Sequence, residues 1–324
     1  MKQTLTTLII IFTAGLMSVG LVSCRKTAQN VDIKTYDQQQ IAAYLQTNNL
    51  TGYSRDLTTG DTTGIYYKII KQGTGPVVDY PDKIYFVYSA NSLDGNFQQS
   101  DTLINHVYNF VGHISPFYTS PALPVGLQLA IKNILKNVGT QAHVIIPSHL
   151  AFGSTGIGTG ASRLPGNETL DYYINIVDPA KQASYDDIVI QKYMTNNGLS
   201  GFTKTASGLY YKVTQAGTGT KTITPTSTIG IQYTGKLMDN TIFDAYNATD
   251  TTSTFRDYTL IPKGWQEGFK YVTKGAKLSL IMPSSLGYGL IPTNPYGFNN
   301  GLGTASVVAP NSVLYYDFNI GTIN

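Results

Sequence analysis

The sequence predicts an α+β fold in two related domains, each a curved antiparallel β-sheet that packs on a short α-helix. Two observations predict it. A block of sequence repeats along the chain, and within each copy apolar residues alternate in several short runs with one main helical stretch among them. Alternation with a period of two is typical of half-buried strands, and several strands with one helix form a two-layer unit. At roughly 150 residues per domain, 324 residues suffice for two such units.

The repeat is clearest around a pair of tyrosines. Residues 64–69 read GIYYKI and residues 208–213 read GLYYKV, and a Gly-Thr-Gly follows each block at the same distance. The offset in this region is 144 residues, whereas the matching upstream residues Asp37 and Asp186 are 149 residues apart. Insertions in loops produce such a drift. We therefore interpret the chain as a duplication of one unit of about 145 residues.

The elements are expected in the same order in both copies. Each copy opens with a short amphipathic helix; in the first, Ile41, Tyr44 and Leu45 have helical spacing. Strand patterns follow, and in the second copy they cover residues 229–234, 278–282 and 314–320.

The main helix of each copy is expected to end at a glycine. In the second copy Trp265, Phe269 and Val272 share one helical face, and Gly275 is expected to end the helix. In the first copy the same spacing runs through residues 127–138 and stops before another glycine.

Composition excludes several classes of function. Charged residues make up 13% of the chain and the net charge is +3 without a block of like charge, so no nucleic-acid surface is expected. The single cysteine excludes an intramolecular disulfide and a thiolate metal cluster. The four histidines lack the spacing of metal ligands and are expected on the surface or in the core, namely His106, His113, His143 and His149. We therefore expect no metal and no cofactor.

The first 23 residues resemble a lipoprotein signal peptide. Lys2 precedes an apolar run over residues 8–22, which is short for a membrane-spanning helix of roughly 20 residues. The run ends in Leu-Val-Ser-Cys, which resembles a bacterial lipobox and implies an acylated Cys24 as the mature N-terminus and membrane anchor. No aspartate follows Cys24, which favours the periplasmic face of an outer membrane. An ordinary secretory signal with an incidental cysteine is the alternative.

Six separated blocks stand in a fixed order in the second copy. They read YTGKL at 233–237, FD at 243–244, GWQEG at 264–268, GAK at 275–277, LGYG at 286–289, and APN with LYYD at 309–317. In this order they resemble the FK506-binding-protein (FKBP) family of peptidyl-prolyl isomerases, over roughly residues 206–324. Two such domains behind a lipobox resemble FKBP-type lipoproteins of Gram-negative envelopes. The resemblance implies proline-containing polypeptides as substrates and macrolides as inhibitors.

The resemblance also implies a role for each type of residue in the pocket. Trp265 would form the floor, Asp244 would lie beside the twisted amide, and the Tyr288 hydroxyl would donate to a substrate carbonyl. The residues implied as catalytic are Tyr233, Phe243, Asp244, Trp265 and Tyr288. Those implied in substrate binding are Phe255, Ile261, Val308 and Tyr316, the last of which stands where the family usually has phenylalanine.

Prolyl isomerisation suits such residues. Rotation about the prolyl bond crosses a barrier of about 18–20 kcal/mol but breaks no bond, so it needs neither a nucleophile nor a metal. A water-poor site that binds the twisted amide more tightly than the planar one accelerates the rotation, by tenfold for each ~1.4 kcal/mol. Aromatic walls supply shape and exclude water.

Each assignment has a structural alternative. Tyr233 and Tyr316 are expected to point inward on strands and could be plain core residues. Trp265 could likewise be a core residue of its helix, and Asp244 could cap a turn.

Three features depart from the family pattern. Asn240 replaces the usual glycine at a turn, where asparagine tolerates a positive φ. One extra residue lies between Ile261 and Trp265. The loop over residues 290–306 is longer than usual and rich in glycine and asparagine, so it could cover the pocket or block a macrolide.

The first copy keeps the aromatic walls but changes three other positions. Gln98 stands in place of the aspartate, Leu127 in place of the tryptophan and Phe152 in place of the tyrosine hydroxyl. The retained wall residues are Tyr88, Phe97 and Tyr172. We expect a scaffold with weak or absent isomerase activity.

The expected organisation follows from these observations. It comprises a signal peptide over 1–23, a tether with a short helix over 24–61, a degenerate domain over 62–178, a linker with a short helix over 179–205 and an isomerase domain over 206–324. The expected function is isomerisation of X-Pro bonds in envelope proteins by the second domain. One alternative is a chaperone-like or partner-binding lipoprotein without catalysis. A carbohydrate-contacting envelope protein, favoured only by the many tyrosines and asparagines, is another.

Overall fold

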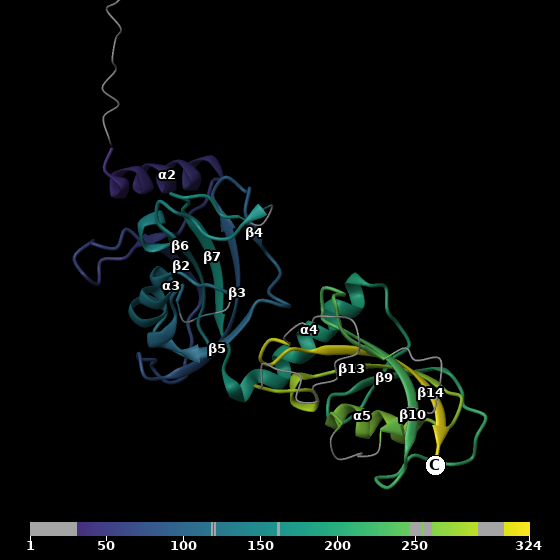
Figure 1. Cartoon of the computed structure of the whole chain (residues 1–324). Helices are drawn as coiled ribbons and strands as arrows, with labels where there is room; N and C mark the ends of the chain where they lie inside the picture. Colours follow the sequence, from purple (N-terminus) through teal and green to yellow (C-terminus); the bar gives the residue numbers. More distant parts are fainter. Residues whose placement is uncertain are drawn as a thin grey trace, which may run out of the picture.

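The computed structural model contains two antiparallel β-sheets, each packed on short helices (Figure 1). It describes residues 31–117, 119, 121–160, 163–246, 254–255, 261–290 and 308–324. The predicted α+β fold with two sheet-and-helix domains is confirmed. The predicted signal peptide over residues 1–23, Cys24 and most of the 290–306 loop lie outside the described residues. Within them, no helix is both long and apolar enough to cross a membrane.

Within the described residues, the first domain carries seven strands in the order β1-β2-β6-β7-β3-β4, with β5 also paired to β3. The strands are β1 (Ser54–Arg55), β2 (Tyr66–Lys71), β3 (Lys83–Ser92), β4 (Gln98–Gln99), β5 (His106–Phe110), β6 (Gln141–Ile146) and β7 (Leu170–Ile176). Its helices are α2 (Ile33–Thr47) and α3 (Val125–Ala130), and a π-helical turn over Ile131–Leu135 continues α3.

The second domain has the same topology, in the order β8-β9-β13-β14-β10-β11 with β12 also paired to β10. The strands are β8 (Thr203–Lys204), β9 (Tyr210–Gln215), β10 (Ile229–Lys236), β11 (Ile242–Tyr246), β12 (Thr254–Phe255), β13 (Lys277–Met282) and β14 (Leu314–Ile323). Its helices are α4 (Gln182–Asn196) and α5 (Lys263–Gly268), the latter continued by a 3₁₀ turn over Phe269–Tyr271. Equal topology in both sheets is what a duplicated unit predicts.

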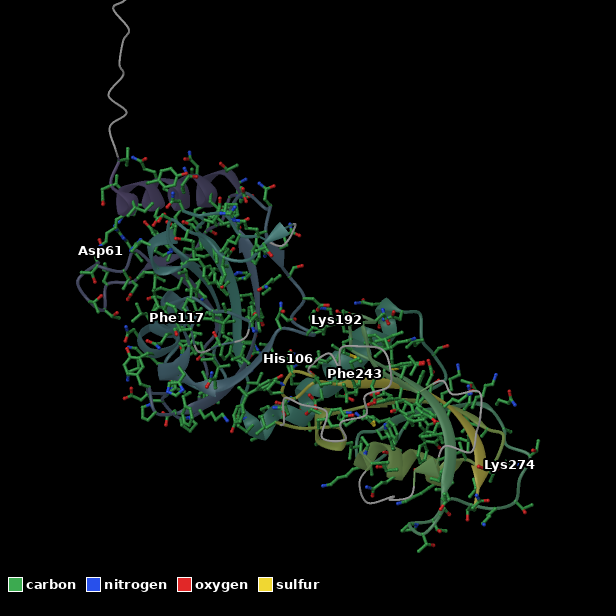
Figure 2. All side chains as sticks on the ribbon, in the orientation of Figure 1. Asp61, His106, Phe117, Lys192, Phe243 and Lys274 are labelled. Carbon is green, nitrogen blue, oxygen red and sulfur yellow. The ribbon has the colours of Figure 1, made fainter. Side chains whose placement is uncertain are left out.

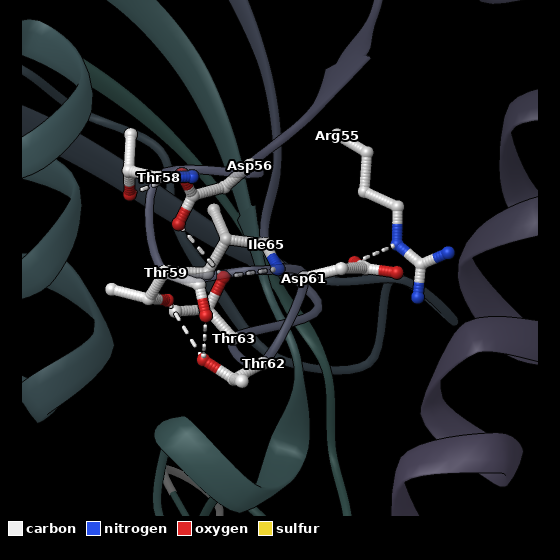
Figure 3. A network of polar contacts seen from close by, with 8 residues as sticks. All are labelled: Arg55, Asp56, Thr58, Thr59, Asp61, Thr62, Thr63 and Ile65. Carbon is white, nitrogen blue, oxygen red and sulfur yellow. Dashed lines mark hydrogen bonds and ion pairs between the residues drawn. The ribbon is translucent and has the colours of Figure 1, made fainter.

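The loop before β2 in the first domain is longer than the loop before β9 in the second domain. Figure 3 shows the polar contacts within this longer loop. The amide of Asp56 bonds to the carbonyl of Ile65 across nine positions, whereas the equivalent bond in the second domain joins Thr205 to Leu209 across four. These five extra residues account for the change of the repeat offset from 149 to 144. The buried Asp56 carboxylate accepts bonds from the hydroxyls of Thr58 and Thr63, at 2.7 and 2.8 Å, and so closes the loop on itself.

The main helices are shorter than the sequence predicts. The helix α5 ends at Gly268, and Val272 is already extended with φ −132°. Gly275, with φ +84°, turns the chain into β13 and bonds through its amide to the carbonyl of Ile320. The chain must reach this bond from the helix within a few residues, so the expected end of the helix at Gly275 is wrong. In the first domain the helical segment ends at Leu135 for the same reason, before the glycine that turns into β6.

Two glycines let α5 lie close to the sheet. A Cβ added to Gly264 would lie 2.3 Å from the sulfur of Met282, and one added to Gly268 would lie 2.7 Å from a methyl of Leu280. Both positions are one helical turn apart, so the bare backbone of one face of α5 packs against β13. This close approach places Trp265, which lies between them, deep against the sheet.

The helices α2 and α4 each dock on the following sheet through a buried aspartate. In the second domain, Asp186 accepts bonds from the amide and the hydroxyl of Ser284, at 2.9 and 2.7 Å, and from the side-chain amide of Gln182 at 2.7 Å. Asp37 of α2 accepts comparable bonds from His149, at 3.3 Å from the amide and 2.8 Å from Nδ1. Burial raises the pKa of Asp186 above its ordinary value.

Removing the Asp186 carboxylate is expected to destabilise the second domain. In Asp186→Ala the buried amide and hydroxyl of Ser284 lose their acceptor, which costs about 2–3 kcal/mol. The neighbouring Asp187 makes a partly exposed ion pair with Lys204, so Asp187→Ala is a matched control that costs less than about 1 kcal/mol. Urea unfolding followed by fluorescence of Trp265, the only tryptophan of the chain, measures both losses. Equal losses in the two variants would show that Asp186 does not anchor the helix.

Candidate functional site

The centre of the candidate site is Trp265, in the first turn of α5 and only 3% exposed. Among the described residues, three aromatic rings lie edge to face around its indole. The ring centroids of Tyr233, Tyr316 and Phe318 lie 4.8, 4.9 and 4.8 Å from that of Trp265. The three rings come from β10 and β14, which are neighbours in the sheet. Period-two alternation places Tyr316 and Phe318 on the same face of β14, the face that α5 covers.

A second group of rings adjoins the first. The ring of Phe243 on β11 stands nearly perpendicular to Tyr316 at 5.6 Å and to Tyr288 at 6.4 Å. The hydroxyls of Tyr288 and Tyr316 lie 3.2 Å apart and share a hydrogen bond. Burial, and then the nearby Tyr288, raise the pKa of Tyr316 well above its ordinary value. The Tyr316 hydroxyl therefore stays protonated and can act as a donor at any physiological pH.

The carboxylate of the site is Asp244, which is 7% exposed and lies beside these rings. The Tyr233 hydroxyl donates to its Oδ2 at 3.0 Å. The register of β10 and β11 shifts here, because Gly235 pairs with Asp244 while Lys236 pairs with Ile242. This β-bulge re-aims a side chain in the strand, so that the consecutive residues Phe243 and Asp244 are both buried.

Gly235 is a site residue that the sequence reasoning missed. A Cβ at this position would lie 2.5 Å from a ring atom of Tyr316 and 3.1 Å from one of Phe243. The glycine therefore lets both rings meet over β10. Its place in the Tyr-Thr-Gly motif could have indicated this, because glycine inside a strand often marks a bulge or a close approach. Phe318 was also missed, although its alternation with Tyr316 was visible.

Seven of the proposed site residues belong to one buried apolar cluster, namely Tyr233, Phe243, Ile261, Trp265, Tyr288, Val308 and Tyr316. Asp244 joins them through Tyr233. The backbone of Phe255 pairs with Ile229 at the edge of the sheet, but its side chain lies outside the described residues. Asn240 has φ +67°, as predicted for the turn between β10 and β11.

The corresponding region of the first domain differs in its polar groups. Leu127 is fully buried on α3 where the tryptophan lies in the second domain. Within the described part of the chain, the buried hydroxyl of Tyr88 has no hydrogen-bond partner. Gln98 is exposed, and its amide donates instead to the carbonyl of Gly95 at 3.2 Å. The strand pair β3–β4 has no register shift here. Without the bulge and the carboxylate, this region is a plain aromatic and aliphatic core.

Comparisons with known proteins agree with this geometry. A family model described as FKBP-type peptidyl-prolyl cis-trans isomerase matches residues 219–320, the segment that holds the aromatic cluster. The FKBP-type peptidyl-prolyl cis-trans isomerase FkpA of Buchnera aphidicola from Acyrthosiphon pisum is 30% identical over 181 residues, covering 55% of this chain and 70% of the relative. The chain belongs to the FKBP-type peptidyl-prolyl cis-trans isomerase family.

Other known proteins match shorter parts of the chain. The outer membrane protein MIP of Legionella longbeachae is 35% identical over 94 residues, which cover 29% of this chain and 40% of that protein. The crystal structure of FkpA from Escherichia coli is 25% identical with a TM-score of 0.34, covering 45% of this chain and 62% of that one. The chain spans less than half of the length of three further curated relatives, between 40% and 44%.

The candidate site in the second domain presents aromatic rings, the Asp244 carboxylate and tyrosine hydroxyl groups. No group of three or more potential metal-ligating side chains occurs among the described residues. Such an arrangement can bind an amide and exclude water from it. It offers hydrogen-bond donors and an acceptor, and it holds them rigidly because the rings pack on one another.

Proposed function

We propose that the chain catalyses the cis–trans isomerisation of X-Pro bonds and that the second domain carries this activity. Membership of the FKBP family supports the reaction. The observation that carries the assignment to the second domain is the buried Asp244, held by the Tyr233 hydroxyl among aromatic rings. The described residues of the first domain show no counterpart of this pair, since the Tyr88 hydroxyl finds no acceptor among them.

The proposed mechanism is preferential binding of the twisted amide. A planar amide is polar because its nitrogen lone pair is delocalised onto the carbonyl oxygen, and this delocalisation is lost on twisting. Apolar walls formed by Tyr233, Phe243 and Trp265 therefore disfavour the planar form relative to the twisted one. In this mechanism Asp244 interacts with the rotating group, and the bond from Tyr233 fixes the orientation of its carboxylate. No atom is transferred and no covalent intermediate forms.

Substrate binding is proposed to use the remaining residues. When Tyr316 donates to the Tyr288 oxygen, the Tyr288 proton can turn to a substrate carbonyl. Val308 and Phe255 would contact the residues that flank the proline, and the amide of Ile261 would donate to a second carbonyl. Macrolides that occupy such a site would act as inhibitors.

A protease-coupled assay with a short X-Pro peptide tests the function. The full chain is expected to accelerate the slow cis-to-trans phase in proportion to its concentration, since the uncatalysed step takes tens to hundreds of seconds. The absence of any acceleration at micromolar protein would refute the proposal and favour a binding protein without catalysis. The altered first-domain site already supports such a binding or spacing role for that domain alone.

We also propose that the chain is a lipoprotein of the cell envelope, anchored through Cys24 and acting on envelope proteins. The lipobox-like Leu-Val-Ser-Cys and the relative named outer membrane protein MIP support this location. Two or three acyl chains hold a protein stably at a bilayer. Cys24→Ser is expected to move the protein from the membrane fraction to the soluble fraction. Retention of the variant in the outer-membrane fraction would contradict lipid anchoring.

A further inference from the structure

We propose that the first domain positions the substrate-binding side of the second domain, through His106 and Leu103. This inference rests on the proposed isomerase function. These two residues of the first domain contact residues 308–313 of the second domain, the 308–313 segment. It begins at Val308, a residue of the site, and continues into β14, which carries Tyr316.

The first contact is a hydrogen bond between the domains. His106 begins β5 at the junction of the two domains, where Figure 2 labels it. Its Nδ1 lies 3.0 Å from the carbonyl oxygen of Pro310, two residues after Val308, and the two partners are 204 residues apart in sequence. A carbonyl oxygen only accepts, so Nδ1 carries the proton and donates it. The bond ties the backbone of the second domain to the sheet of the first.

His106 is fixed on its own side as well. Its ring packs edge to face on Tyr85 at 5.7 Å, and the Tyr85 hydroxyl lies 3.1 Å from the same Nδ1. The side chain is 5% exposed, and burial lowers its pKa to about 4, whereas the nearby Asp101 and the Pro310 carbonyl oppose this shift. The ring is therefore neutral and has one defined tautomer at physiological pH.

The 308–313 segment is connected directly to the site. The amide of Asn311 bonds to the carbonyl of Gly289, the residue after Tyr288. The Asn311 side chain donates to Gln182 of α4 at 3.1 Å, and Gln182 in turn donates to the docking residue Asp186. A shift of this segment therefore moves both Val308 and the turn that holds Tyr288.

The second contact is apolar. Leu103, in the loop between β4 and β5 of the first domain, is 6% exposed. It belongs to one buried cluster with Val313 at the end of the segment, Met238 of the β10–β11 turn and residues of α4. Tyr185 of α4 also packs against the first sheet, in a cluster with Tyr85. Figure 1 shows α4 lying between the two sheets.

Side chains do not fill the junction throughout. A cavity of about 300 Å³ lies beside the contact, lined by Tyr85 and Tyr108 of the first domain and by Leu290 and Asn311 of the second. His106 and Leu103 therefore add contacts from the first domain to those that α4 already makes with the segment, beside a space that side chains leave open. The first domain is thus a positioning element for the site of the second.

The test uses the full chain and three variants at position 106 or 113. His106→Leu removes the donor, and His106→Asn restores an amide donor near the place of Nδ1. His113→Leu is the control, since His113 is exposed and lies in the first domain. For an X-Pro peptide, His106→Leu is expected to lower kcat/KM about three- to tenfold, mainly through KM, and His106→Asn to recover most of it. Amide hydrogen exchange in the 308–313 segment should accelerate in His106→Leu only.

The outcomes separate this inference from the proposed function. A wild-type chain without isomerase activity refutes the function, and the hydrogen exchange then still tests the positioning. An active chain whose kcat/KM and exchange are unchanged in His106→Leu overturns the inference. If His106→Leu unfolds the first domain, Leu103→Ala replaces it, because Leu103 is buried in a cluster of second-domain and α4 residues. Leu103→Ala is then expected to lower kcat/KM and to accelerate hydrogen exchange in the 308–313 segment, and no change in either overturns the inference.

Discussion

Asp244→Ala is expected to lower kcat/KM for an X-Pro peptide by about ten- to a hundredfold while the fold is retained. Asp244 is the buried carboxylate of the site, and the Tyr233 hydroxyl orients it at 3.0 Å. A preorganised polar group in a water-poor site contributes about 1.4–2.7 kcal/mol to the stabilisation of a transition state, which corresponds to this loss of rate. The protease-coupled assay measures it.

Two further variants make this result specific. Gln98→Ala changes the exposed residue at the equivalent position of the first domain and is expected to leave kcat/KM unchanged. Asp244→Asn keeps the size of the side chain and an acceptor for Tyr233 but removes the charge, so its activity should fall between those of the wild type and Asp244→Ala. If Asp244→Ala keeps full activity, Asp244 is a structural residue of the β10–β11 hairpin, the alternative that the sequence left open.

Trp265→Leu is expected to lower kcat/KM at least tenfold and to destabilise the second domain by about 3 kcal/mol. The leucine is the residue that the first domain carries at this place, where Leu127 is fully buried in the same fold. The substitution removes the indole, whose ring centroid lies 4.8 Å from that of Tyr233 and 4.9 Å from that of Tyr316. Loss of a large buried aromatic side chain costs about 3–5 kcal/mol when alanine replaces it, and leucine refills part of the space. Peptide assays and circular dichroism during urea unfolding measure the two effects.

Phe269→Leu distinguishes a site residue from a core residue. Phe269 lies one helical turn after Trp265, is 1% exposed and contacts the same ring of Phe318. Its replacement should destabilise the domain to a similar extent and leave kcat/KM within about twofold of the wild type at a temperature where the protein is folded. Equal losses of activity in both variants would mean that Trp265 acts only through stability.

Local sequence patterns were sufficient for much of the fold. Alternation located β10, β13 and β14, because a half-buried strand repeats its environment every two residues. The positive φ of Asn240 followed from the kind of residue that a tight turn requires. The cluster around Trp265 was accessible through the resemblance to a family, since the residues come from four separate strands and helices.

Other features depend on contacts that no local pattern encodes. The bulge opposite Gly235 arises from the register between β10 and β11, and it decides that Phe243 and Asp244 are both buried. The early end of α5 depends on the bond of Gly275 to Ile320, which is remote in sequence. The burial of His106 depends on another domain, and the sequence could say only that it is a surface or core residue.

We expect the second domain to carry the isomerase activity and the first domain to have none of its own. Proline-limited refolding of a reference protein, with residues 179–324 and residues 31–178 added separately, tests it most directly. The fragment 179–324 keeps α4 and its Asp186–Ser284 anchor. We expect this fragment to accelerate refolding, below the rate of the full chain because it lacks His106, and the fragment 31–178 to have no effect. A lack of acceleration by the fragment 179–324 would contradict the account, and so would acceleration by the fragment 31–178.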